Sequence, residues 1–353
     1  MEYRNLGNSG LRVSTMTLGT MTFGGSGRMA SLGDTDVAGA RRQIDMCIDR
    51  GVNFFDTANM YSAGASEEIL GEAIKDKRDD LLLATKVRFP MGEGPNEDGL
   101  SRQHILTQCD ASLRRLQTDR IDLYQLHQWD GLTPLEETLQ TMDQLVRDGK
   151  VRYYGISNFS GWHLMKVMQT CERHGFIKPV SQQIHYTPQA REAEYELMPA
   201  ASDQGLGTMI WSPLAGGLLS GKYRRGQTNP DGTRFSQGWT EPPIRDEAQL
   251  YNVIDKLVEV GESHGVSAAQ VTLAWLLSRQ GVTTTVIGAR KDHQLEDNLA
   301  GAELTLSQHE IEAIETASRP PLIYPYWHQL KTAAKRFGPT DRILHQPYLD
   351  ASE

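Results

Sequence analysis

Eight short apolar runs are spread along the chain, and segments with helical character separate most of them. Runs that are apolar on both faces and alternate with helices are typical of a parallel sheet covered by helices. Eight is also the number of strands that closes a (β/α)8 TIM barrel. The sequence therefore predicts an α/β barrel with strands at Met16–Gly19, Val52–Asp56, Leu81–Lys86, Ile121–His127, Val151–Ser157, Val180–Gln183, Gly207–Ser212 and Thr284–Gly288.

A barrel of this kind commonly takes about 250 residues, so the 353 residues of this chain leave room for additions. Tyr3–Ser14, with GNSG at its centre, predicts a hairpin ahead of the barrel. Arg224–Arg245 is a long polar loop rich in Gly and Pro. Asp246–His264 and Ser267–Arg279 are predicted to be two helices between the seventh and eighth strands, and the chain after Leu306 forms a tail.

A doubly wound open sheet shows the same alternation of strands and helices. We favour the barrel because no break in strand order and no shift in composition divides the chain. The prediction is one domain over residues 1–353, with the hairpin at 1–15, the barrel at 16–305 and the tail at 306–353.

The formal net charge of −9 argues against general binding to nucleic acid, because no run of Lys and Arg builds a basic patch. No apolar run approaches the roughly 20 residues that cross a bilayer, and the N-terminus lacks the apolar segment of a secretory signal. The three widely spaced cysteines, Cys47, Cys109 and Cys171, suit a reducing compartment. We therefore expect a cytoplasmic protein without nucleic-acid or membrane partners.

Three short motifs point to other functions but lack the sequence context that those functions need. GSGRMA (Gly25–Ala30) matches the dinucleotide pattern G-x-G-x-x-A, yet the turn-forming SLGDTD follows it in place of a helix, so we interpret it as a flexible loop. GGLLSGKY (Gly216–Tyr223) approaches a P-loop, but Tyr223 stands where Ser or Thr must bind magnesium. His309-Glu310 lacks the second histidine of a zinc-protease motif, and no metal is predicted.

Polar side chains stand at the ends of three consecutive predicted strands. Asp56 ends the second strand and Tyr61 lies in the loop after it, whereas Lys86 and His127 end the third and fourth. The site of a barrel is built from the C-terminal strand ends and the loops that follow. Neighbouring strands lie about 5 Å apart, so these four side chains can converge. Each alone is more often a surface or packing residue, but together they indicate a functional site.

A carboxylate, an ammonium group and a phenol placed together can move a proton. The lysine charge stabilises the phenolate and lowers the tyrosine pKa from its ordinary value near 10, while the acid keeps the lysine charged and oriented. A histidine beside them can donate a hydrogen bond to a substrate oxygen. The group therefore predicts a tyrosine that protonates a carbonyl oxygen as negative charge develops there.

The remaining strand ends resemble a ligand cradle. Ser157-Asn158 and Gln183 are suited to bind a carboxamide, and the indole of Trp211 can stack on an aromatic ring. Arg290, at the end of Gly288-Ala289-Arg290, can bind a phosphate near a helix N-terminus. A ring, an amide and a phosphate together describe a nicotinamide dinucleotide. Polar strand ends are common in barrels, so the cradle alone leaves other ligands open.

The chain resembles the aldo-keto reductase family from residue 3 to about residue 305. DTANMYSAGASEEILGEAI matches the family's segment around its acid and tyrosine, LLLATKV its lysine strand, and ASLRRLQTDRIDLYQLHQWD the segment that leads to its histidine. GKVRYYGISNF, WSPLAGGLLSGKY and VIGARKDHQLEDNL match its cofactor segments. The resemblance implies a (β/α)8 barrel that holds NADP(H) in an extended pose, with Asp56, Tyr61, Lys86 and His127 as the catalytic tetrad and Tyr61 as proton donor.

Carried over position by position, the resemblance also implies a set of cofactor-binding residues. Ser157, Asn158 and Gln183 are expected to hold the carboxamide, and Trp211 to stack on the nicotinamide. Ser212, Leu214 and Lys222 are expected along the pyrophosphate. The adenosine end is assigned to Arg290, Gln294 and Asn298, with Asp297 at the position of an acidic family residue, and the first strand contributes Gly19, Thr20 and Met21, with Gly288 at the eighth.

Two departures from the common family pattern are informative. Trp211 stands where many members have tyrosine or phenylalanine. A tryptophan at this position resembles the branch of the family that contains potassium-channel beta subunits. Gly288-Ala289-Arg290 leaves the charge of the phosphate segment to Arg290, so a preference for NADP(H) over NAD(H) is an expectation only.

The substrate pocket is expected to be shaped by loops, with Phe23, Arg88, Trp129 and Phe159 as candidate substrate-binding residues. LIYPYWHQL (Leu322–Leu330) in the tail either reaches over the barrel mouth or packs on the barrel wall, and the sequence leaves both open. We predict an NADP(H)-dependent oxidoreductase that acts on a small-molecule carbonyl or alcohol. It would reduce aldehydes or ketones, or oxidise sugars or other secondary alcohols. The alternative is a redox-sensing regulatory subunit with slow turnover, for which an N-terminal extension is the expected mark. Oligomeric state stays open.

Overall fold

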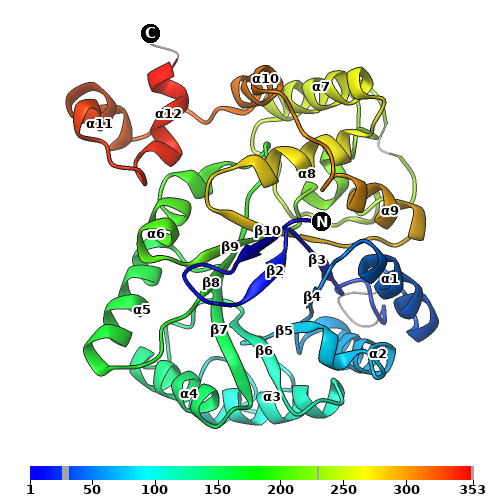
Figure 1. Ribbon diagram of the computed structural model, residues 1–353, viewed down its shortest axis with the longest axis vertical. Coiled ribbons are helices and arrows are strands. Elements are labelled where there is room, and N and C mark those ends of the chain that lie inside the picture. Colours follow the sequence, from blue (N-terminus) through cyan, green and yellow to red (C-terminus); the bar gives the residue numbers. More distant parts are fainter. Residues whose placement is uncertain (26–31, 229, 351–353) are drawn as a thin grey trace.

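Eight parallel strands form a closed barrel in the computed structural model, which describes residues 1–25, 32–228 and 230–350 (Figure 1). Each strand pairs with the next along the chain, and β10 closes the ring by pairing with β3 through Thr285 and Met16. The closure confirms the predicted (β/α)8 barrel and rules out the doubly wound open sheet. The strands are β3 Met16–Gly19, β4 Phe54–Asp56, β5 Leu82–Val87, β6 Ile121–Leu126, β7 Val151–Ser157, β8 Ser181–His185, β9 Gly207–Trp211 and β10 Val282–Ile287.

Helices surround the barrel and bury the outer faces of the strands (Figure 1). Several begin where the sequence offers a capping side chain, as at Ser160, whose hydroxyl accepts a hydrogen bond from the His163 backbone at the start of α5. The helices are α1 Val37–Asp49, α2 Ala65–Ala73, α3 Arg102–Arg115, α4 Leu135–Arg147, α5 Gly161–His174, α6 Leu197–Gln204, α7 Glu247–His264, α8 Ala268–Ser278, α9 Asp292–Ala300, α10 Gln308–Ser318, α11 Tyr326–Ala333 and α12 Arg342–Asp350. As predicted, α7 and α8 lie between the last two strands of the barrel.

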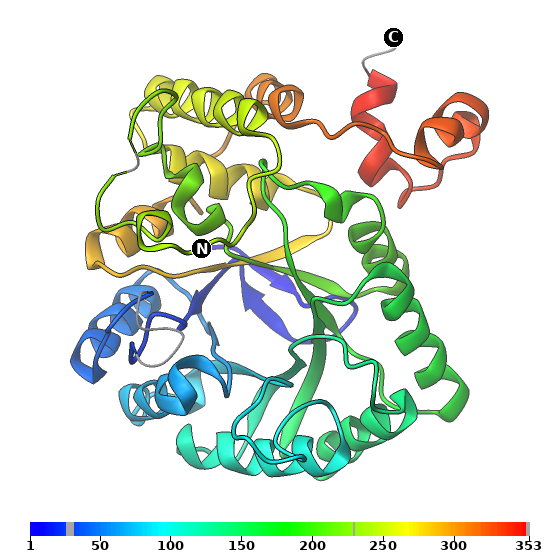
Figure 2. The same ribbon diagram turned by 180° about the vertical axis from the view of Figure 1, so that it is seen from behind.

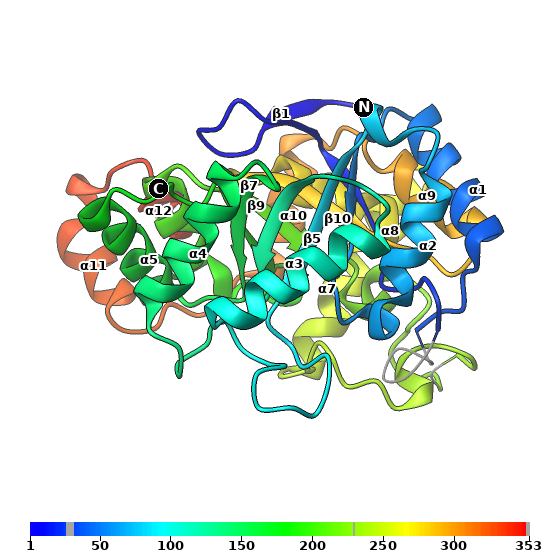
Figure 3. The same ribbon diagram turned by 90° about the horizontal axis from the view of Figure 1, so that it is seen from below.

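The predicted hairpin is present and covers the N-terminal end of the barrel. Strands β1 (Tyr3–Asn5) and β2 (Arg12–Ser14) pair antiparallel, and Leu6 and Val13 are fully buried against barrel residues such as Phe54. Figure 3 shows the hairpin at one end of the barrel and the 224–245 loop at the other. Because the hairpin covers the N-terminal end, the C-terminal strand ends are left to form a site.

The tail runs along the outside of the barrel rather than over its mouth. Helix α10 packs against α7, and α12 packs against α6 (Figure 2). A buried ion network holds α10 in place, in which Arg191 contacts Glu194 at 2.8 Å and Glu315 of α10 at 3.1 Å. The LIYPYWHQL segment packs on the barrel wall and does not reach over the mouth. Its Tyr326 ring stacks on Tyr195, which lies just before α6.

A few boundaries differ from the sequence predictions for local reasons. Strand β4 begins at Phe54 and not at Val52, because the Val52 amide donates to Cys47 as α1 ends. Strand β10 begins two residues early, at Val282, which pairs with Thr208 of β9. The GSGRMA segment lies outside the described residues, apart from Gly25. No helix in the described part of the chain has both the length and the apolar character that crossing a membrane requires.

Candidate active site

Sheet register brings the predicted tetrad together at the C-terminal end of the barrel. Asp56 is the last residue of β4 and pairs with Ala84 of β5, so Lys86 lies two residues farther along, on the same inward face. His127 directly follows β6. Tyr61 opens a short 3-10 turn, in which Ser62 and Ala63 have φ of 50° and 55°, and this bend turns the loop back over the barrel.

Lys86 is fully buried, and each of its three N–H donors has an acceptor. Its Nζ atom donates to Asp56 Oδ2 at 2.5 Å, to the Thr57 carbonyl at 2.7 Å and to the Tyr61 hydroxyl at 3.1 Å. An ammonium group has only these three donors, so its orientation is fixed. Burial lowers the pKa of Lys86, but Asp56 and Tyr61 raise it by more, and the lysine stays charged.

The Tyr61 pKa lies above its ordinary value, which differs from the sequence prediction. Lys86 lowers this pKa, as expected, but burial raises it by more, and Asp56 adds to the rise. Tyr61 therefore carries its proton at neutral pH. Its hydroxyl accepts a bond from Lys86, and no acceptor for its own proton lies among the described residues. Such a phenol is free to donate to a ligand.

His127 stands beside Tyr61 as a neutral imidazole. The two rings meet edge to face with centroids 6.0 Å apart, and Phe89 packs on the other side at 4.8 Å. Burial lowers the His127 pKa well below its usual range, and the charges of Lys86 and Arg88 lower it further. Its buried Nδ1 atom has no hydrogen-bond partner within the described chain. A neutral imidazole here can donate one hydrogen bond to a ligand oxygen.

Asp56 uses its second oxygen to accept two amide hydrogen bonds. Gln125 of β6 and Gln183 of β8 both donate from Nε2 to Oδ1, at 2.9 Å and 3.0 Å. Gln125 is fully buried and was missed in the sequence analysis. Strand alternation was the available signal, because Gln125 lies two residues before His127 and so on the inward face of a strand.

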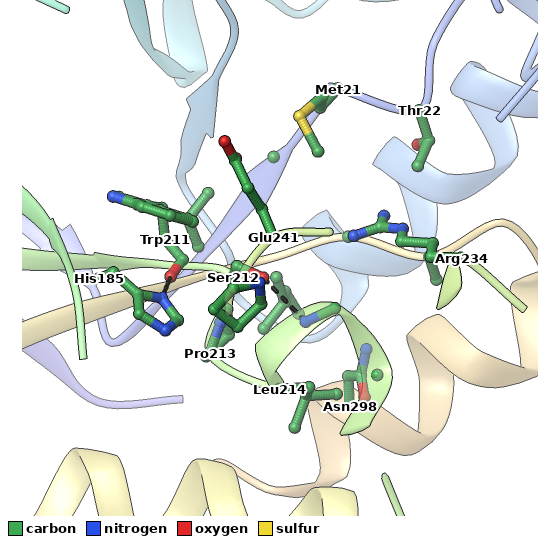
Figure 4. A pocket seen from close by; sticks show the side chains of 18 of the residues that line it. Met21, Thr22, His185, Trp211, Ser212, Pro213, Leu214, Arg234, Glu241 and Asn298 are labelled. Atoms are coloured by element: carbon green, nitrogen blue, oxygen red, sulfur yellow. Dashed lines mark hydrogen bonds between the residues drawn. The ribbon is translucent and has the colours of Figure 1, made fainter. Parts of the chain in front are cut away.

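A cavity of about 1180 Å³ lies at the C-terminal end of the barrel and reaches the tetrad. Figure 4 shows side chains of some of the residues that line it. Tyr61, Asp56 and His127 line one part of it. Of the cofactor-binding residues expected from the resemblance, all except Ser157 line it as well: Gly19, Thr20, Met21, Asn158, Gln183, Trp211, Ser212, Leu214, Lys222, Gly288, Arg290, Gln294, Asp297 and Asn298. Ser157 is buried just beneath and donates to the Gln183 carbonyl at 3.0 Å.

Trp211 is held in place by two neighbours. Its Nε1 atom donates to Asn158 Oδ1 at 2.9 Å. The His185 ring packs against the indole with centroids 4.7 Å apart (Figure 4). His185 also lines the cavity, and its buried Nε2 atom has no partner in the described part of the chain. The predicted strand ends at Gln183, so it does not include His185, which follows on the same face two residues later.

Three cations gather at the other part of the cavity. Lys222, Arg234 and Arg290 line it, and none of them forms an ion pair with a carboxylate of the described residues. Burial lowers the pKa of Lys222, and the charges of Arg290 and Arg234 lower it further. Lys222 and Arg290 are exposed and Arg234 is half-buried, so their like charges repel one another with no carboxylate to balance them, and the arrangement fits an anionic ligand. Arg234 was missed because it lies in a polar loop without periodicity.

The structure does not place the four predicted substrate residues in the cavity wall. Phe23 is fully buried in the core with Leu18 and Ile44, and Arg88 pairs with Asp98 at 3.6 Å. Trp129 packs edge to face on Phe159 in a separate aromatic cluster. The cavity wall includes residues of four loops, among them Met60, Phe89, Gln128, Trp239 and Glu241.

Comparison with known proteins decides the family. A sequence model of the Aldo/keto reductase family matches residues 15–319. The chain belongs to the aldo/keto reductase family. It is 41% identical over 319 residues to the uncharacterized oxidoreductase YrpG of Bacillus subtilis, an alignment that covers 87% of this chain and 93% of that protein.

Other relatives carry a different name. The chain is 35% identical over 312 residues to a probable voltage-gated potassium channel subunit beta of Arabidopsis thaliana, covering 86% of this chain and 92% of the relative. A rice protein with the same name is 35% identical over 323 residues, covering 89% and 96%. Aldo/keto reductases carry out oxidoreduction of carbonyls with nicotinamide cofactors, so this chain is an oxidoreductase of that family.

Proposed function

We propose that this aldo/keto reductase is an NADP(H)-dependent enzyme that reduces an aldehyde or ketone, with Tyr61 as the proton donor. The observation that carries the proposal is the Tyr61 hydroxyl, which accepts a hydrogen bond from Lys86 and keeps its own proton available toward the cavity. Oxidation of a sugar or another secondary alcohol is the same reaction reversed, with Tyr61 as proton acceptor.

The chemistry assigned to each residue follows from its contacts. A nicotinamide held by these residues would supply or take up the hydride at the carbonyl carbon. Tyr61 gives its proton to the carbonyl oxygen, and the neutral His127 donates a hydrogen bond to that oxygen. The Lys86 charge stabilises the phenolate that remains, 3.1 Å away. Asp56 fixes Lys86 and balances its charge in a buried site.

The residues around the cavity fit a dinucleotide with an extra phosphate. Asn158 and Gln183 offer amide groups for a carboxamide, and Trp211 offers an indole face for the ring. Lys222, Arg234 and Arg290 offer more positive charge than a pyrophosphate alone requires, which favours NADP(H) over NAD(H).

The barrel, the hairpin and the tail act as one domain. Three buried free thiols, Cys47, Cys109 and Cys171, support a reducing, cytoplasmic location.

A second function has its own support: a redox-sensing regulatory subunit that binds the cofactor tightly and turns over slowly. The relatives named as probable potassium channel beta subunits favour it, as does the tryptophan at position 211. Turnover separates the two functions. An enzyme oxidises NADPH repeatedly with an excess of its carbonyl, whereas a regulatory subunit gives one slow turnover of preloaded NADPH.

The proposal is tested with a panel of aldehydes, ketones, sugars and secondary alcohols, each measured with NADP(H) and with NAD(H) by absorbance of the reduced nicotinamide. We expect repeated turnover of at least one class and a higher kcat/KM with NADP(H). Binding of NADPH without turnover of any carbonyl or alcohol would support the regulatory subunit instead.

A further inference from the structure

The Asp56 carboxylate depends on more residues than the tetrad contains. It is 2% exposed, and its two oxygens are used differently. Oδ2 accepts from Lys86, while Oδ1 accepts from both Gln125 and Gln183. A buried carboxylate needs such donors, because a charged group without hydrogen bonds is strongly disfavoured in the interior.

The two glutamines differ in what else they can reach. Gln183 lines the cavity, and under the proposed function its amide is needed by the carboxamide of the cofactor. Gln125 is fully buried and is not among the lining residues of the described chain. Gln125 pairs in register with Lys86 on the neighbouring strand, so its side chain stands beside the Asp56–Lys86 pair. Because Gln125 does not line the cavity, its amide does not contact a ligand that binds there.

Gln125 also restrains Gln183. The Gln183 Nε2 atom donates to Gln125 Oε1 at 3.3 Å as well as to Asp56, so the three side chains form one small network. When Gln183 turns toward a ligand, Gln125 is the only amide of this network that still donates to Asp56. The Asp56 Oδ2 atom must keep its orientation at that moment, because it fixes Lys86 beside Tyr61.

We propose that Gln125 is a positioning residue that holds Asp56 against Lys86 once Gln183 has been taken by the cofactor. The inference rests on the proposed function for the role given to Gln183. It predicts redundancy without cofactor, since either glutamine suffices, and dependence on Gln125 when cofactor is bound.

The first experiment needs no turnover. The protein is labelled with ¹³C at the tyrosine Cζ atoms, and the Tyr61 resonance is assigned with Tyr61→Phe. In cofactor-free protein we expect this resonance to stay near its wild-type position in Gln125→Met and in Gln183→Met. In the double variant it should move by clearly more than the sum of the single shifts, because Asp56 then loses both amide donors. Addition of NADP⁺ should move it in Gln125→Met relative to wild type with NADP⁺.

The second experiment measures steady-state kinetics of Gln125→Met. We expect kcat to fall about tenfold, the effect of one hydrogen bond to a charged group, with KM for NADPH unchanged and the pH profile of kcat displaced. Gln182→Met is the matched control. Gln182 is a buried strand glutamine that donates to the Leu197 carbonyl and to Thr208, away from Asp56. It should leave kcat and the pH profile as in wild type.

The outcomes separate this inference from the proposed function. An additive double variant in cofactor-free protein overturns the role of Gln125 whatever the enzyme does. Equal losses of kcat in Gln125→Met and Gln182→Met, with equal drops in Tm and no displaced pH profile, also overturn it, because they show a packing role. Absence of carbonyl turnover in wild type contradicts the proposed function alone, and the cofactor-free resonance still decides the case of Gln125.

Discussion

The Nζ atom of Lys86 lies 3.1 Å from the hydroxyl oxygen of Tyr61 and donates a hydrogen bond to it. Because the other two donors of Lys86 are bound to Asp56 and to the Thr57 carbonyl, the lysine cannot swing away without breaking a buried ion pair. The proton chemistry assigned to Tyr61 therefore depends on an arrangement that is built into the folded barrel.

Replacing Lys86 with Met leaves the Asp56 carboxylate buried beside an apolar side chain. Removal of one partner of a buried pair costs about 3–5 kcal/mol of the free energy of unfolding, and we expect a loss of that size in chemical denaturation. Adding Asp56→Asn should recover part of it, since the stranded charge is gone. Equal stability of Lys86→Met and wild type would show that the pair does not form.

Stability should fall as the solution is acidified below about pH 6.5, the ordinary histidine pKa. Burial lowers the pKa of His127 in the folded protein, so the unfolded chain takes up this proton first and unfolding becomes easier as pH falls. His127→Gln should make the decline between pH 6.5 and 5 shallower by up to about 1.4 kcal/mol per pH unit.

Arg234 should contribute to the binding of the cofactor phosphates. For Arg234→Leu we expect KM for NADPH to rise about tenfold, as for the loss of one charged hydrogen bond, with a smaller rise for NADH. Arg225→Leu is the control, because Arg225 contacts Asn252 and the Tyr251 ring instead of the cavity. An equal effect of both variants would place Arg234 outside the cofactor site.

The tail should have little influence on catalysis. Trp327 of α11 is 50% exposed and lies on the outer wall of the barrel, where Tyr326 donates to Glu196 at 3.2 Å. Trp327→Ala should therefore leave kcat and KM within about twofold of wild type, the usual small effect of a surface substitution. A change in KM for the carbonyl alone would mean that the tail reaches the pocket in solution.

The barrel and the convergence of Asp56, Lys86 and His127 could be predicted because both follow from periodic features. Apolar strands of regular spacing set the sheet register, and register alone brings Asp56, Lys86 and His127 to one end. The same alternation places Gln125 on the inward face, so its position inside the barrel was also predictable from the sequence. Its neighbour His127 was noticed because it ends the strand.

The loop residues that line the cavity could not be predicted, because loops carry no periodic pattern. Arg88 and Phe89 are adjacent in sequence but point in different directions. The Arg88 side chain forms an ion pair with Asp98, whereas the Phe89 ring packs on His127. Phe23 lies in the core, and its backbone pairs with Thr35 in an isolated bridge. No periodic pattern in the sequence predicts these side-chain directions.

The most direct measurement compares wild type and Tyr61→Phe for oxidation of NADPH with the best carbonyl of the panel, together with NADPH binding. The proposed role of Tyr61 predicts that the variant binds NADPH with wild-type affinity and loses at least about a hundredfold in kcat, the usual contribution of a general acid. Turnover by Tyr61→Phe at the wild-type rate would contradict the account.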